Sequence, residues 1–153
     1  MQPEITLSIE AVAPGDVAAL YNLLRASNLP IDGLSAHLTD TLVAKANEQV
    51  VGSAALERYG HSALLRSVAV AEPWRGTGLG RQLVESAFDL ARRQRVQRLY
   101  LLTETAAEWF PRFGFVPVER SAVDPAVRQS VEFASACPDS AQAMLLTFAP
   151  TDN

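Results

Sequence analysis

Apolar and polar positions along the chain follow two different periods. Leu79, Leu83, Ala87 and Leu90 recur at intervals of three or four residues, which is typical of an amphipathic helix. Elsewhere apolar residues alternate with polar ones or form short uninterrupted runs, a pattern typical of strands. We therefore expect helices over residues 17–24, 78–94, 105–113 and 124–136, and strands over residues 5–11, 41–46, 49–57, 63–70, 98–103, 115–119 and 141–149.

The connections between these segments predict how the strands pair. Asn47-Glu48 is a good tight-turn pair, and Tyr59-Gly60-His61 forms a second turn, so three consecutive strands make an antiparallel meander. The long helix then crosses over between the strands at 63–70 and 98–103, which makes these two parallel. We therefore expect an α/β fold with a mixed, mostly antiparallel sheet of about seven strands flanked by helices.

Composition narrows the class of protein. The chain has 153 residues, of which 48% are hydrophobic and 20% charged, so we expect one domain over residues 1–153. A net charge of -4 gives no general attraction to nucleic acid or anionic lipid, and no run approaches the roughly 18 apolar residues of a membrane span. One cysteine, Cys137, and two histidines supply neither a disulfide nor a Cys/His zinc site. We expect a cytoplasmic protein without a metal, a membrane partner or a nucleic-acid partner.

A glycine-rich turn, Arg75-Gly76-Thr77-Gly78-Leu79-Gly80, lies between a strand and the long helix. Backbone N–H groups at a helix start lack partners, and the helix dipole favours negative charge there, so the turn predicts an anion site. The alternative is that the glycines merely permit close packing of helix and strand. The sequence lacks the lysine of a Walker loop, and Glu104 falls too late for a Rossmann fingerprint.

The glycine-rich turn and the segments around it resemble the cofactor motif of the GNAT N-acetyltransferases. The resemblance covers residues 65–70, Pro73 and residues 75–80, and it continues in residues 99–103 and 107–115. It implies a GNAT fold in which the strands at 63–70 and 98–103 splay apart and acetyl-CoA, the co-substrate, lies in the gap. By this resemblance the cofactor-binding residues are Val68, Ala69, Val70, Arg75, Gly76, Thr77, Gly78, Leu79, Gly80 and Arg81.

Within that family, residues 66–70, 100–103 and 109–110 are similar to short glutamate N-acetyltransferases and, more closely, to N-acetyltransferases of arsenic-resistance operons. Residues 125–128 and 132–138 also resemble the arsenic-linked group. The similarity implies acetyl transfer to the primary amine of a small amino-acid-like acceptor, including toxic glutamate analogues. Alternatives are a glutamate N-acetyltransferase of arginine biosynthesis and a non-catalytic acyl-CoA sensor. The predicted acceptor-binding residues are Arg66, Thr103, Trp109 and Phe110, and the alternative for the two aromatic residues is that they simply fill the core.

The catalytic roles are assigned less directly. A guanidinium at Arg66, in an otherwise apolar strand, needs an anionic partner, which is either a substrate carboxylate or an internal one such as Glu57. By the resemblance, the backbone N–H of Val68 stabilises the oxyanion. We choose Glu57 as the base, against the alternative that it is an inert, exposed glutamate at a strand end. Edge-strand pairing into a homodimer stays open.

Protonation of the departing thiolate has no clear donor in the sequence. Family members often use a tyrosine where Phe110 stands here, and a phenyl ring cannot donate a proton. Water or one of Tyr59, Tyr100 and Thr103 is left for this role. We interpret His37 and His61 as solvated turn residues. We interpret Cys137 as a small packed residue.

Overall fold

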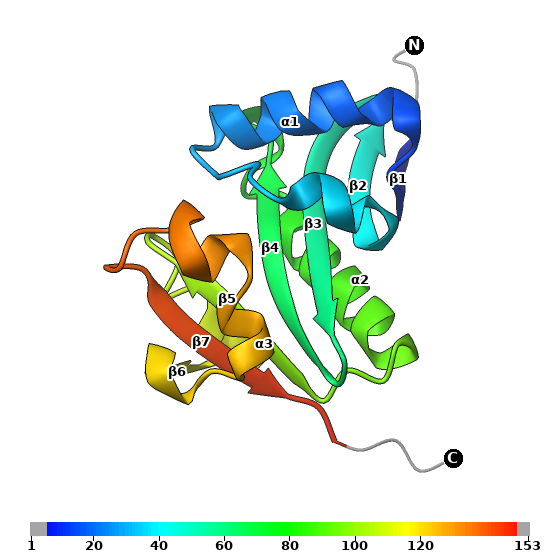
Figure 1. Ribbon diagram of the computed structural model, residues 1–153. Helices are drawn as coiled ribbons and strands as arrows, with labels where there is room; N and C mark the ends of the chain where they lie inside the picture. The colour runs from blue at the N-terminus through cyan, green and yellow to red at the C-terminus, as the bar shows by residue number, and fades with distance from the viewer. Residues whose placement is uncertain (1–5, 150–153) are drawn as a thin grey trace.

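The computed structural model describes residues 6–149, and these form one seven-stranded sheet with helices on both faces (Figure 1). The strands are β1 (Leu7–Ala11), β2 (Thr41–Ala46), β3 (Gln49–Tyr59), β4 (Ser62–Val70), β5 (Arg98–Thr103), β6 (Val116–Val118) and β7 (Gln142–Thr147). The helices are α1 (Val17–Ala26), α2 (Leu79–Arg93) and α3 (Pro125–Arg128). Short helical turns are η1 (Pro14–Asp16), η2 (Leu34–Asp40), η3 (Glu72–Trp74), η4 (Phe110–Phe113), η5 (Arg120–Ala122) and η6 (Glu132–Ala136).

The strand order is β1-β2-β3-β4-β5-β7-β6, and every neighbouring pair is antiparallel except β4 with β5. The predicted mixed, mostly antiparallel sheet is confirmed. The β2–β3 turn also forms where expected, because Asn47 and Glu48 both adopt the positive φ angles (49° and 71°) that two-residue hairpin turns require.

Helices α1 and α2 pack on opposite faces of the sheet (Figure 1). Successive side chains of a strand point to opposite faces, so Leu56 of β3 packs in the core formed with α2, whereas its neighbour Ala55 packs with Leu20 and Leu24 of α1. The two faces therefore have separate apolar cores. A third apolar cluster, around Tyr100, lies under α3 and the segment that follows it.

Two predicted helices form only in part. Residues 105–113 contain one short turn, η4, because Pro111 has no N–H to donate to the preceding turn and Gly114, at φ 103°, ends it. Residues 124–136 divide into α3 and the π turn η6. The Ser130 hydroxyl lies 3.3 Å from the N–H of Phe133 and accepts a hydrogen bond from it at the division. Residue 5 of the first predicted strand lies outside the described residues.

A β-bulge in β4 changes which side chains of that strand share a face. Ser53 pairs with Ala69 and Ala55 pairs with Arg66, so two β4 residues oppose one residue of β3. Ser67, at the bulge, has φ 59°, and its carbonyl accepts a 2.6 Å hydrogen bond from the Ser53 hydroxyl. The extra residue shifts the alternation by one position, so Val68 faces the α2 core on the same side as Leu65.

Strands β4 and β5 pair over a short distance only. Their parallel register joins Ser62–Leu64 to Arg98–Tyr100, and beyond these residues the two strands separate, as Figure 1 shows above the α3 label. The predicted splay is confirmed. The edge of β4 from residue 65 onward thus faces a gap in the sheet rather than a neighbouring strand.

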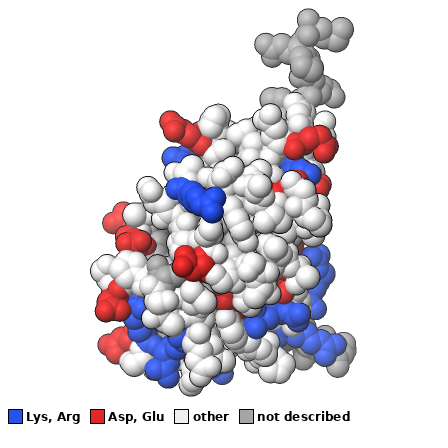
Figure 2. Space-filling model, turned by 45° about the horizontal axis from the view of Figure 1, so that its top comes forward, with Lys and Arg blue, Asp and Glu red and all other residues white. Residues whose placement is uncertain are grey.

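The face of the molecule drawn in Figure 2 carries both charge signs side by side. Figure 2 shows basic and acidic residues intermixed around a largely uncharged central area. Within residues 6–149, no helix has both the length and the apolar character needed to cross a membrane.

Candidate functional site

The start of α2 forms the first part of the site. Gly78 is its N-cap, with φ 89°, and Gly76 has φ 79°, values that glycine adopts without the steric cost other residues incur. A Cβ atom at either position would meet no protein atom within 4 Å, so both glycines border open space. Because the first N–H groups of a helix have no intrahelical acceptor, this mouth suits an anion.

Side chains within the glycine-rich turn hold its shape. Nε of Arg75 lies 3.0 Å from the Val70 carbonyl oxygen and donates to it, and the Thr77 hydroxyl donates to the Trp74 carbonyl at 2.5 Å. Arg75 therefore helps to fix the shape of the loop. Gly80 lies against Trp109, whose Cζ2 atom would be 3.4 Å from a Cβ placed there.

A cavity of about 410 Å³ lies directly over this mouth. Its walls combine the end of β4, the glycine-rich turn and the aromatic side chains that precede β6. The predicted cofactor residues Thr77 and Leu79 belong to the turn but are absent from the walls of this cavity. Its lining residues are Val68, Ala69, Val70, Trp74, Arg75, Gly76, Gly78, Gly80, Arg81, Trp109, Arg112 and Phe113.

A second cavity, of about 630 Å³, lies in the gap between β4 and β5. It shares Val68, Arg75 and Trp109 with the first cavity, so the two adjoin. Its polar lining includes Arg66, Ser67, Thr103, Glu104, Glu132 and Cys137, and Phe110 contributes to its apolar wall. All four residues predicted to bind the acceptor thus border this space.

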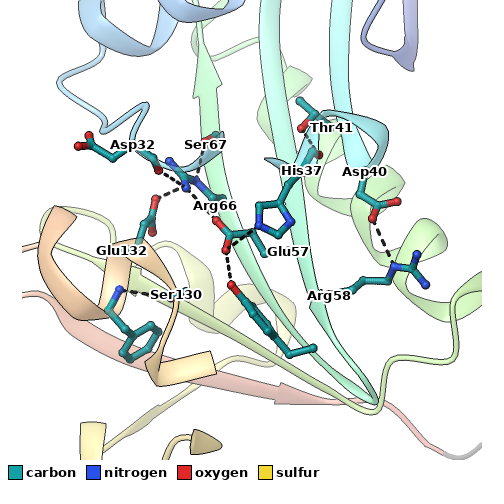
Figure 3. A network of polar contacts seen from close by, with 12 residues as sticks. Asp32, His37, Asp40, Thr41, Glu57, Arg58, Arg66, Ser67, Ser130 and Glu132 are labelled. Atoms are coloured by element: carbon teal, nitrogen blue, oxygen red, sulfur yellow. Dashed lines mark hydrogen bonds and ion pairs between the residues drawn. The ribbon is translucent and has the colours of Figure 1, made fainter. Parts of the chain in front are cut away.

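Arg66 is the centre of a buried polar network (Figure 3). Its Nη1 atom lies 2.8 Å from Oε2 of Glu57, and its Nε atom lies 3.1 Å from Oε2 of Glu132. Nη1 and Nη2 also donate to the carbonyls of Asp32 and Pro30, at 2.7 and 3.0 Å. The Arg66 side chain has no exposed surface. Of the two anionic partners considered for Arg66, the internal carboxylate is therefore the one present.

Glu57 is not the exposed strand-end residue that the sequence suggested as an alternative. Its side chain is 2% exposed, and its Oε1 atom accepts a 2.5 Å hydrogen bond from the Tyr59 hydroxyl and lies 3.4 Å from Nε2 of His37. With Arg66 on the other oxygen, the carboxylate has partners on both sides. Neither of the two cavities is lined by Glu57. Glu57 is buried because His37 of η2 and Arg66 of β4 both lie against its carboxylate. The alternation of apolar and polar residues along the strand does not reveal these contacts.

Glu132 is a cavity-lining carboxylate that the sequence reasoning did not single out. Burial raises the pKa of the Glu132 carboxyl to about 7, although the Arg66 guanidinium opposes the shift. Burial and the Glu132 carboxylate raise the pKa of the neighbouring Cys137 thiol to about 12, so this cysteine stays protonated at neutral pH. A signal was present in the sequence, since Glu132 is a charged residue amid apolar and small neighbours, but its partner lies 66 positions away.

The three side chains considered as proton donors to the departing thiolate differ in their access to the second cavity. Tyr59 donates to Glu57, and burial together with that carboxylate raises the pKa of its phenol well above the usual value. Tyr100 is buried in an apolar cluster. Of the three candidates, Thr103 is the one that lines the second cavity, and its hydroxyl accepts a 2.9 Å hydrogen bond from the N–H of Ala106. His37, expected to be solvated, lies beside Glu57 instead.

Residues 37–117 match the family model described as an acetyltransferase (GNAT) domain. An uncharacterized N-acetyltransferase of Chlorobaculum tepidum is 33% identical over 91 residues, which are 59% of this chain and 58% of that protein. The match thus spans less than two thirds of the relative's length.

Two solved structures share the fold. N-acetylglutamate synthase from Neisseria gonorrhoeae, complexed with coenzyme A and N-acetyl-glutamate, gives a TM-score of 0.79 at 19% identity, over 95% of this chain and 36% of that one. A GNAT family N-acetyltransferase from Escherichia coli, in complex with CoA, gives 0.63 at 27% identity, over 76% and 72% of the two chains.

Proposed function

Because the chain belongs to the GNAT acetyltransferase family, whose model matches more than half of its length, we propose that it transfers an acetyl group from acetyl-CoA to the primary amine of a small amino-acid-like acceptor. One observation carries the proposal. The unpaired edge of β4 runs from the second cavity to the glycine-rich mouth of α2, so a single extended ligand fits along it with its anionic end at the helix start.

In the proposed complex, the pyrophosphate lies on the mouth of α2 and the pantetheine arm follows β4 as an added strand would. Backbone N–H groups of the turn bind the phosphates, and the walls of the first cavity enclose the arm. Trp109, which lines both cavities, marks the point where the thioester meets the acceptor. The proposed cofactor contacts come from Val68, Ala69, Val70, Arg75, Gly76, Thr77, Gly78, Leu79, Gly80 and Arg81.

The proposed reaction is direct transfer without a covalent enzyme intermediate. The neutral amine attacks the thioester carbonyl, the N–H of Val68 stabilises the oxyanion, and the thiolate leaves. Cys137 is a poor nucleophile, since its thiol stays protonated. Phe110 supplies no proton, so water or the Thr103 hydroxyl protonates the thiolate. Glu57, the base chosen from the sequence, reaches the acceptor only through the Arg66 network.

We propose an acidic, glutamate-like acceptor, including toxic arsenic- or phosphorus-containing analogues. The sequence similarity to arsenic-resistance N-acetyltransferases supports this choice, and the Neisseria enzyme with the same fold was solved with N-acetyl-glutamate. In this proposal the second cavity binds the acceptor and is called the acceptor cavity. Arg66 supports its wall without binding the acceptor carboxylate, because its guanidinium is already paired with Glu57 and Glu132. Thr103, Trp109 and Phe110 form the contact surface.

The test is an acetyl-CoA-dependent thiol-release screen over amino acids, polyamines and phosphorus or arsenic analogues of glutamate. We expect the highest kcat/KM for a glutamate analogue, with mass spectrometry showing one acetyl group on its nitrogen. Preference for glutamate itself would favour the arginine-biosynthesis alternative. Saturable acetyl-CoA binding without thiol release from any amine would favour the sensor, for which Phe110 is the supporting observation.

A further inference from the structure

We infer that the Glu132 carboxylate is the base that takes the proton from the acceptor amine. This inference rests on the proposed acetyl transfer and adds a catalytic residue to it. The Glu132 side chain lies where such a base is needed. It begins η6 and lines the second cavity, which Val68 and Thr103 also line.

The position of Glu132 is held by packing and by charge. The loop between α1 and η2 packs closely against Val131, the residue that precedes Glu132. A Cβ atom at Gly33 of that loop would lie only 2.8 Å from Cγ2 of Val131. Arg66 joins the same two segments by donating to the Asp32 carbonyl and pairing with Glu132 at 3.1 Å. The carboxylate is therefore oriented before any acceptor binds.

Three charged or titratable groups act on the ionisation of Glu132, and a fourth lines the same cavity. Arg66 of β4 stabilises its ionised form, whereas Glu57 of β3 opposes ionisation. The Cys137 thiol donates a hydrogen bond to it, and Glu104, which follows β5, lines the same cavity. With a pKa of about 7, Glu132 is ionised often enough at neutral pH to accept a proton and is basic enough to hold it.

The two network glutamates differ in what they can reach. Glu57 has partners on both oxygens and lines neither cavity, whereas Glu132 lines the acceptor cavity. Its side chain is 5% exposed, so the acceptor amine meets a largely desolvated carboxylate. Desolvation strengthens a carboxylate as a base toward an ammonium group beside it.

The proton balance follows from this placement. Glu132 takes one proton from the acceptor ammonium, and the neutral nitrogen forms a C–N bond to the thioester carbon while the carbonyl π electrons move to oxygen. The tetrahedral intermediate collapses, the C–S bond breaks, and the second nitrogen proton ends on the departing thiolate to give CoA thiol. Glu132 then releases its proton to water.

The test compares kcat/KM against pH for the wild type and for Glu132→Gln, which keeps the side-chain shape. We expect a loss of about 10²- to 10⁴-fold in kcat/KM at neutral pH and disappearance of the acid limb near pH 7. Glu132→Asp should restore part of the rate. Glu104→Gln removes the other carboxylate of the cavity, and retention of the acid limb in that variant assigns the limb to Glu132.

A second readout separates a base from a merely structural residue. An amino-oxy analogue of the acceptor is neutral at pH 7, so Glu132→Gln should affect its acetylation far less than that of the ordinary amine. Acetyl-CoA affinity should be unchanged, because Glu132 does not line the first cavity. Equal loss with both acceptors, or an unshifted acid limb, would overturn the inference. Thiol release by the wild type tests the proposed function separately.

Discussion

Nη1 of Arg66 lies 2.8 Å from Oε2 of Glu57, and the two side chains are 0% and 2% exposed. The same guanidinium pairs with Glu132 and donates to carbonyls of the loop that precedes η2. One residue of β4 thereby joins β3, that loop and η6. Of these segments, the loop and η6 contribute lining residues to the second cavity, and β3 lies behind them through Glu57.

Arg66→Ala should lower the free energy of unfolding by about 3–5 kcal/mol, because it leaves two carboxylates buried without their cation. The control is Arg58→Ala, which breaks a half-exposed pair with Asp40 at 3.3 Å and should cost less than about 1 kcal/mol. Urea unfolding monitored by circular dichroism measures both. Equal losses would mean that burial does not set the strength of the Arg66 network. Acetyl-CoA affinity of the folded variant should remain near wild type.

Gly78→Ala should weaken acetyl-CoA binding at least tenfold. The new methyl group enters space that no protein atom occupies within 4 Å, where the proposed phosphates lie. The control is Gly60→Ala, which also has positive φ and no protein neighbour for a Cβ, but lies in the β3–β4 turn. Both variants should lose about 1–2 kcal/mol of stability through backbone strain. Calorimetric titration with acetyl-CoA distinguishes them, and similar affinities in the two would argue against a phosphate site at α2.

Glu132→Gln should change how stability depends on pH. Because the folded-state pKa of Glu132, about 7, is above its ordinary value of 4.5, the contribution of the neutral acid is complete below pH 4.5 and is lost as pH rises through 7. Glutamine does not titrate. The stability of the wild type relative to the variant should therefore fall by about 3 kcal/mol between pH 4 and pH 8.

Denaturant titrations of both proteins across that range measure the difference. Glu104→Gln, which replaces an exposed carboxylate of the same cavity, should show no comparable trend. A difference between wild type and Glu132→Gln that stays constant with pH would show that folding does not raise the pKa of Glu132.

Elements with a strong local signal were predicted accurately. The helix expected over 78–94 forms as Leu79–Arg93, because its apolar positions repeat with the helical period over four turns. The β2–β3 turn and the parallel β4–β5 pair were likewise predictable from a turn dipeptide and a crossover helix. The helix expected over 105–113 was wrong for the most part, since Pro111 outweighed the apolar pattern.

The candidate site likewise has parts that follow from local sequence and parts that depend on how distant segments pack. The glycine-rich mouth of α2, which is proposed to bind an anion, is a local feature, because a strand end, glycines and a helix start that adjoin in sequence already contain its backbone donors and its dipole. That part was predictable without a fold. The bulge at Ser67 was not, since a bulge is defined by the register of two strands and a one-residue shift leaves no clear mark on composition.

Glu57 and Glu132 show the limit most directly, because 75 positions separate them in the chain and one guanidinium binds both. Whether a carboxylate is hydrated, paired or held beside a cavity depends on the desolvation and charges brought by distant segments, and these terms exceed any local preference. Sequence pattern thus sufficed for the class of fold, the order of most elements and the helix mouth that suits an anion. Folding in three dimensions determined that Glu132 lines the second cavity and that Glu57 is buried against Arg66 without lining it.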